Sequence, residues 1–207
     1  MTHTLHRRAG ADGLRDDFVI MAMPARGFNN DEKVVEKLQE FLAIFSRHNP
    51  NNMGAMGIGH LYESTPEQII QKVYPELPMV HGVFRNREDV VAALKEIKAE
   101  DMGISIIVTG LVDAADCCAR EAGLTRHSIN YSLGIWGKTE LLPDEKYLQI
   151  TSMCGHAMIS VNLVKKMIAD VKKGVITLDQ AAAELAKPCV CGIFNGARAR
   201  RILEELM

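Results

Sequence analysis

The sequence predicts an α/β or α+β fold in which helices cover a mixed β-sheet and a helical segment follows at the C-terminal end. Short apolar runs rich in β-branched residues alternate with amphipathic patterns through the first two-thirds of the chain. This alternation is typical of a sheet covered by helices. From about residue 157 onward only helices are predicted. No repeat or low-complexity linker divides the 207 residues, a length that fits a single domain.

Five segments have strand-like patterns. Residues 17–23, 78–84 and 103–110 are apolar runs bounded by turn residues, which predicts buried strands. Residues 127–136 alternate and contain β-forming residues, as do residues 147–151. We therefore expect two further strands there.

Helices are predicted from apolar periodicity and from capping residues. Thr65 and Thr177 each precede a glutamine by three residues, the spacing of a capping box. Pro188 ends an alanine-rich helical pattern, since proline disrupts a helix interior. We expect helices from residue 34 to about 49, after Thr65, after Asn86, over 113–122 and 157–173, after Thr177, and from 195 to 207.

The domain organisation predicted from these elements is simple. Residues 1–17 contain His, Arg and Asp but no apolar signal-peptide core, so they are interpreted as a polar N-terminal tail. Residues 18–207 form one domain, within which 175–207 could be a helical subdomain.

The composition disfavours several classes of function. The 24 basic and 26 acidic residues give a net charge of −2, and aromatic residues make up 5%. Neither value favours binding to nucleic acid or to an anionic membrane surface. No apolar run reaches the roughly 18 residues of a membrane span. We expect a cytoplasmic protein with reduced thiols, and a homo-oligomer is compatible with the sequence.

The five cysteines are the strongest functional signal. Their number is odd, and none occurs before residue 117. In a reducing compartment, clustered cysteines indicate metal binding or catalysis more often than disulfide bonds. The chemistry is therefore expected in the C-terminal half.

Cys154 lies in the string Ser152-Met153-Cys154-Gly155-His156. With a strand expected before it and a helix after it, Cys154 is placed in a sharp turn at a helix N-terminus. Free N–H groups and the helix dipole favour a thiolate there. His156 could add a positive charge or relay a proton, so it is a candidate catalytic residue. The alternative is a small buried cysteine that only fills the turn.

Cys189 and Cys191 form a Cys-x-Cys pair after Pro188. In an extended Cys-x-Cys segment both side chains point to the same side, so both can reach one metal ion or cluster. The helix expected from Asn195 offers its N-terminus to an anionic centre. A chance pair in a structural loop is the competing interpretation.

Two further candidate groups lie on the predicted helix 113–122. Adjacent residues on a helix diverge by about 100°, so Cys117 and Cys118 cannot both face one site. Cys118 is a candidate cluster ligand, although core packing explains a helical cysteine equally well. Asp113 is a candidate acid–base group, and helix capping is its alternative role.

These residues lead to the principal hypothesis, an iron–sulfur protein. Cys154, Cys189 and Cys191 would bind a [4Fe–4S] cluster that has one iron without a cysteine from this trio. That iron could take Cys117, Cys118, a histidine, or an oxygen of a small anionic substrate. A redox partner protein is the alternative to a substrate, and whether the chain is an enzyme is left open. Zinc is a weaker alternative, because Cys-x-Cys differs from the usual zinc knuckle spacing.

A second hypothesis rests on a resemblance. Met153-Cys154-Gly155-His156, followed by a helix, is similar to the first catalytic-cysteine motif of the proline racemase family, and Pro188-Cys189-Val190-Cys191-Gly192 loosely echoes the second. The resemblance implies a cofactor-free racemase or epimerase, or another thiol-dependent enzyme, in which one thiol and one thiolate exchange a proton. His60, His81 and His127 stand near predicted strand ends, and the sequence leaves their roles open.

Overall fold

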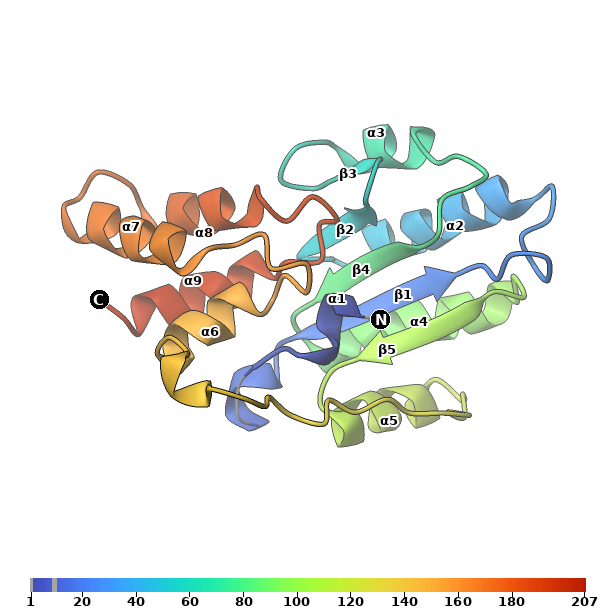
Figure 1. Cartoon of the computed structure of the whole chain (residues 1–207). Coiled ribbons are helices and arrows are strands. Elements are labelled where there is room, and N and C mark those ends of the chain that lie inside the picture. The colour runs from blue at the N-terminus through green and yellow to red at the C-terminus, as the bar shows by residue number, and fades with distance from the viewer. Residues whose placement is uncertain (1, 9–10) are drawn as a thin grey trace.

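The computed structural model describes residues 2–8 and 11–207 and shows a five-stranded sheet with helices on both faces (Figure 1). The strand order is β3-β2-β4-β1-β5. Every pair of neighbouring strands in it is antiparallel. The predicted combination of sheet and helices is confirmed, but the expected mixture of parallel and antiparallel pairs is not found. The strands are β1 (Phe18–Met23), β2 (Asn52–Ala55), β3 (Gly59–His60), β4 (Val80–Phe84) and β5 (Ser105–Thr109).

The helices begin where the sequence supplies caps. Thr65 and Thr177 form complete capping boxes, and Asn86, Ser160 and Asn195 each accept a backbone N–H through the side chain. The helices are α1 (Thr2–Leu5), α2 (Val34–Arg47), α3 (Pro66–Gln71), α4 (Arg87–Glu100), α5 (Val112–Glu121), α6 (Glu145–Thr151), α7 (Val161–Lys172), α8 (Leu178–Ala186) and α9 (Gly196–Glu204), with 3₁₀ turns η1 (Ala11–Leu14) and η2 (Thr139–Leu141).

The sheet is built from two interleaved split β-α-β units. β4 lies between β1 and β2, and β1 lies between β4 and β5. In register, Met21 pairs with His81 on one side and with Ile107 on the other. A strand inserted between the two strands of each unit explains why the alternating order of strands and helices gives an antiparallel sheet.

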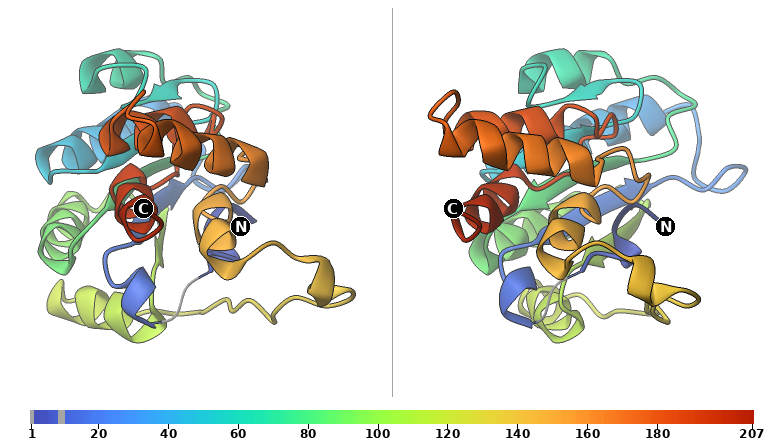
Figure 2. Two further views of the ribbon diagram at one scale, coloured as in Figure 1. Left: turned by 90° about the vertical axis from the view of Figure 1, so that its left-hand side faces the viewer. Right: turned by 60° about the vertical axis from the view of Figure 1, so that its left-hand side comes forward.

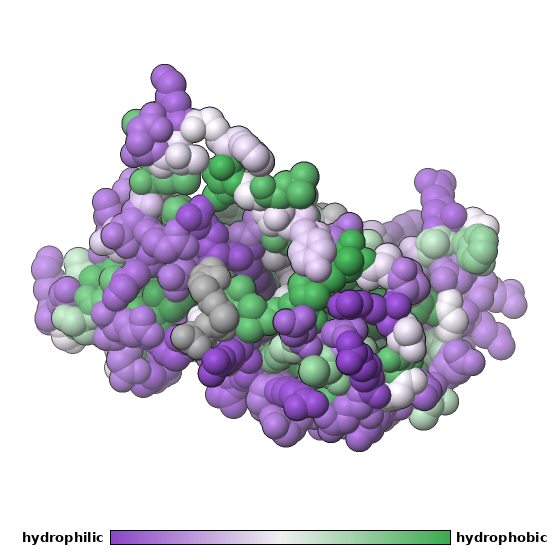
Figure 3. Space-filling view, turned by 90° about the horizontal axis from the view of Figure 1, so that it is seen from below, coloured by the Kyte–Doolittle hydropathy of each residue, from purple (hydrophilic) through white to green (hydrophobic). Residues whose placement is uncertain are grey.

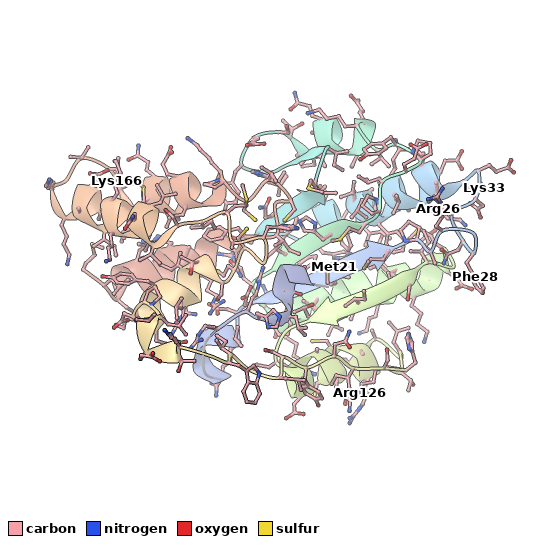
Figure 4. The ribbon with its side chains drawn as sticks, in the orientation of Figure 1. Met21, Arg26, Phe28, Lys33, Arg126 and Lys166 are labelled. Atoms are coloured by element: carbon pink, nitrogen blue, oxygen red, sulfur yellow. The ribbon has the colours of Figure 1, made fainter. Side chains whose placement is uncertain are left out.

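Alternation along β1 divides the interior into two cores. Phe18, Ile20 and Ala22 belong to the core that includes α2 and α4. Val19 and Met21 belong to the second core, which contains residues of α6, α7, α8 and α9. The four C-terminal helices gather beside one end of the sheet (Figures 1 and 2). Met21 lies on the face of β1 turned away from α2 and α4 (Figure 4).

Two predicted strands are wrong. Residues 147–151 lie in α6, where the Asp144 side chain accepts the Lys146 N–H and starts the helix. A run of five residues is too short for its alternation to outweigh a cap. Residues 127–136 form no strand, although their backbone is not helical either. The long helix expected from residue 157 begins instead at Val161.

The N-terminal segment expected to be a polar tail packs against the domain. Within it, Thr4 is buried and its hydroxyl lies 2.9 Å from that of Thr109 on β5. Arg7 and Asp17 are buried as well. Residues 1 and 9–10 of the predicted tail lie outside the described residues. Nowhere in the described chain does a helix combine the length and apolar character needed to cross a membrane.

Candidate functional site: a buried trio of thiols

The structure brings Cys154, Cys189 and Cys191 together. Cys154 lies in the turn between α6 and α7, and the other two lie in the loop between α8 and α9. The sulfur atoms of Cys189 and Cys191 are 3.7 Å apart, and the Cys189 thiol also forms a hydrogen bond with Cys154. The three residues are 2%, 0% and 3% exposed. We call these three residues the thiol trio.

The turn that holds Cys154 differs from the predicted strand-to-helix turn. It follows a helix, and its backbone is fixed by hydrogen bonds from Cys154 N to Thr151 O and from Ala157 N to Cys154 O. Ala157 has a positive φ of 56°, which is uncommon for a residue with a side chain. In this conformation the N–H groups of His156 and Met158 both donate to the Cys154 sulfur. The turn, rather than the first turn of α7, therefore supplies the donors.

The loop that holds the Cys-x-Cys pair is tightly wound. Cys189 N donates to Ala186 O, and Gly192 N donates to Cys189 O at 2.7 Å. Gly192 has φ +74°, and a Cβ at this position would lie 2.4 Å from the Cβ of His60. Only glycine fits this close approach. The following N–H, of Ile193, donates to the sulfur of Cys191.

The hydrogen bonds separate the pKa values of the three thiols. The hydrogen bond from Cys189 is the largest cause that lowers the pKa of Cys154 to about 6, and the N–H groups of Met158 and His156 lower it further. The pKa of Cys191 is also lowered to about 6, first by Cys189 and then by the Ile193 N–H. Hydrogen bonding to these two neighbours raises the pKa of Cys189. Two thiols with a lowered pKa, Cys154 and Cys191, thus flank one with a raised pKa, Cys189.

An ionic network holds both cysteine loops from the side of the N-terminus. Arg7 donates to the carbonyl of Met153 at 3.3 Å and to the carbonyl of Ile193. The same guanidinium forms an ion pair with Asp17, which also pairs with Arg198 at 2.8 Å. Met153 precedes Cys154, and Ile193 donates to Cys191. Arg7 therefore connects the two loops just behind the trio.

The remaining predicted site residues divide into two groups. His156 is exposed, and its electrostatic interaction with Cys154 and Cys191 lowers the pKa of both, so it belongs to the site. Cys118 is buried in the core on the α2 and α4 face, whereas the trio lies in the other core. Cys117 and Asp113 lie on the same helix as Cys118, α5, but both are exposed. The structure does not bring these α5 residues to the trio.

Two residues beside the trio, Arg7 and His60, were not assigned to the site from the sequence. Arg7 lies in a segment whose charges predicted a solvated tail. His60 is fully buried beside Gly192, and neither ring nitrogen has a hydrogen-bond partner among the described residues, although Glu63 Oε2 lies 3.7 Å from Nε2. Burial lowers the pKa of His60. His81 is likewise buried in β4, whereas His127 is exposed.

The trio is enclosed by protein. Two cavities of about 550 and 630 Å³ lie elsewhere among the described residues, and no member of the trio lines either one. Among the described residues no group of three or more His, Cys, Asp or Glu side chains, the trio included, is arranged so that it could hold a metal ion. Comparison of the chain with protein-family models, with curated proteins and with solved structures finds no match. The interpretation of the trio rests on its chemistry alone.

Proposed function

We propose that the protein binds an iron–sulfur cluster through Cys154, Cys189 and Cys191. The observation that supports this proposal is the convergence of three buried thiols, two of them with pKa values lowered to about 6. Thiolates are the form that binds iron. N–H groups directed at the sulfurs and an apolar surrounding are the features by which proteins tune such clusters.

Three cysteines would leave one iron of a [4Fe–4S] cluster without a cysteine of the trio. Each thiolate binds a different iron, so the sulfurs, which now touch, must separate when a cluster binds. Cys154 lies in one loop, and Cys189 and Cys191 lie in the other. Rotation about the Cα–Cβ bond of each cysteine is the smallest movement that changes the distances between the sulfurs. Because the three cysteines are at most 3% exposed, their burial favours electron exchange with a redox partner over a reaction with a small anionic substrate at the open iron.

A mononuclear zinc site is the second candidate, and one distance favours it. Two thiolates bound to one tetrahedral zinc at about 2.3 Å lie about 3.8 Å apart. The Cys189 and Cys191 sulfurs are separated by 3.7 Å. The cysteine-dependent racemase receives less support, because two thiols in direct contact leave no room between them for a substrate carbon.

The deciding experiment is anaerobic purification of the full chain followed by iron, zinc and acid-labile sulfide analysis with an absorption spectrum. We expect iron and sulfide near four each per chain and a broad absorbance near 400 nm. Substitution of any one of the trio with serine should remove most of the iron. Cys117→Ser is the matched control, because Cys117 is exposed and remote from the trio, and it should retain the metal.

The other outcomes are equally informative. About one zinc per chain without sulfide would replace the cluster with the mononuclear site. A protein without metal whose trio reacts readily with a thiol reagent would overturn both metal proposals and favour thiol chemistry.

A further inference from the structure

Residues 127–136, which we call the arm, expose an unusual amount of apolar surface. They follow α5 and run outward from the body of the molecule (Figure 2). Their large apolar side chains are well exposed: Ile129 43%, Tyr131 61%, Leu133 85%, Ile135 46% and Trp136 82%. A soluble monomer seldom presents so many large apolar groups on one extended segment.

The backbone of the arm also lacks partners. Within the described chain, residues 125–136 make no backbone–backbone hydrogen bond. The Ser132 hydroxyl, bonded to His6 Nδ1 at 2.9 Å, ties the arm to the N-terminal segment. Apolar residues at 129, 131, 133 and 135 alternate as in a strand with one apolar face. The arm therefore has the pattern of a strand without a sheet to join.

The free edge of β5 is the complementary feature. Among the described residues β5 is the last strand of the sheet, and β1 is its one paired neighbour. Its sequence, Ser-Ile-Ile-Val-Thr, has no charge and no proline, the usual devices that protect an exposed edge. Four of its five residues are half-buried and Ser105 is exposed. This edge is open to another strand.

A cavity of about 630 Å³ lies along that edge. Its wall includes β5, α5 and the first half of the arm, and its lining includes Ile107, Leu124, Ile129 and Tyr131. Viewed from below, apolar residues lie along a hollow on this side of the molecule (Figure 3). Arg126, at the base of the arm, lies on the same side beside α5 (Figure 4). The Nε atom of Arg126 is 3.4 Å from Oδ1 of Asp116, so the charge at the base of the arm is already paired.

We propose that the arm of a second copy of this chain adds to the free edge of β5, and that the exchange is reciprocal. Each chain carries a strand-like segment without a sheet and, at β5, a sheet edge without a strand. A two-fold dimer satisfies both with the same pair of surfaces. Neither the arm nor β5 contains Asp, Glu, Lys or Arg. No charge must therefore be buried when they pair.

The first test is the mass of the full chain, purified with whatever metal it carries, by size-exclusion chromatography with light scattering. We expect twice the chain mass of 22.9 kDa. Leu133→Asp should weaken the dimer at least tenfold, because it places a charge in the apolar face of the arm. Val175→Asp is the matched control: Val175 is 67% exposed between α7 and α8, and the mass should not change. Both sites are exposed, so neither change should impair folding.

Hydrogen exchange locates the contact. Amides of the arm and of β5 should become protected as the protein concentration rises, and Leu133→Asp should abolish this protection. A single-chain mass at every concentration would overturn the proposal, and that is the outcome expected if a small apolar ligand or another protein covers β5. A dimer unaffected by Leu133→Asp, or arm protection independent of concentration, would overturn it as well.

Discussion

Arg7 and Asp17 form an ion pair in which the two side chains are only 4% and 0% exposed. Burial by itself raises the pKa of Asp17, but the charges of Arg7 and Arg198 outweigh it and the net pKa is lowered. Because Arg7 also donates to the carbonyls of Met153 and Ile193, the pair joins the start of β1 to both cysteine loops. The network thus couples the stability of the domain to the geometry of the thiols.

Arg7→Met should therefore destabilise the protein and disturb the trio. Removal of one partner from a buried ion pair typically costs about 3–5 kcal/mol, and here Asp17 would keep Arg198 and the side-chain amide of Asn195. The trio should also react faster with a thiol reagent, because two loop carbonyls lose their donor. Chemical denaturation and the rate of thiol modification measure the two effects.

Arg8→Met is the matched control for this change. Arg8 pairs with Glu145, and the two side chains are 29% and 48% exposed. An exposed pair contributes at most about 1 kcal/mol, so the loss of stability should be small and the thiol reactivity unchanged. If Arg7→Met lowered stability while thiol reactivity stayed at the wild-type rate, the role of Arg7 in positioning the loops would be rejected.

The pKa values of the trio predict how the reduced, metal-stripped protein responds to pH. Cys154 and Cys191 have folded pKa values of about 6, below the value of about 8.5 for an unfolded cysteine. Their contribution to stability is therefore fully present above about pH 8.5 and is lost as the pH falls through about 6. The free energy of unfolding should rise between pH 6 and 8, and denaturation at a series of pH values measures it.

Cys189 has the opposite effect on the free energy of unfolding, and this effect appears at pH values above that range. Its pKa is raised in the folded state, so it opposes folding only above about pH 8.5, where the unfolded thiol ionises. Replacement of both Cys154 and Cys191 with serine should flatten the rise between pH 6 and 8. An equally steep rise in the double variant would show that other groups cause it.

Cys189→Ala should raise the pKa of both remaining thiols of the trio. The hydrogen bond from Cys189 is the largest cause of the lowered pKa at Cys154 and at Cys191. The ultraviolet absorbance of thiolates should therefore titrate at a higher pH than in the wild-type chain. Cys117→Ala removes an exposed thiol on α5 and should leave the midpoint in place. An unchanged midpoint in Cys189→Ala would contradict the conclusion that hydrogen bonding with Cys189 lowers the pKa of the other two thiols.

Much of this architecture was predictable because local signals coincide with tertiary ones. The apolar runs of β1, β4 and β5 and the caps at Thr65, Asn86 and Thr177 specify their elements locally. The alternating pattern of residues 127–136 misled the prediction, because a strand also needs a neighbour and these residues pair with no strand of the described chain. Strand pairing is non-local as well. Nothing in the sequence states that β4 inserts between β1 and β2.

The candidate site likewise combines residues that could be predicted from the sequence with residues that could not. Cys154, Cys189 and Cys191 were identified by residue type and spacing, and the structure brings them into contact. Cys118 was one candidate for the fourth ligand because of its residue type, which says nothing about the face of the sheet on which a residue lies. Arg7 could not be found, because its importance depends on carbonyls 146 and 186 residues away.

Gly192 and Gly174 provide a paired test of how closely the Cys191 loop is packed. Their φ angles are similar, +74° and +69°, but a Cβ on Gly192 would lie 2.4 Å from His60 Cβ, whereas a Cβ on Gly174 would meet nothing within 4 Å. Gly174→Ala should cost about 1 kcal/mol for the left-handed conformation alone. Gly192→Ala adds overpacking, typically about 1–3 kcal/mol, and should also displace Cys191 and lower metal binding. Equal losses of stability in the two variants, measured by denaturation, would mean that the loop yields easily and that Gly192 does not fix the position of Cys191.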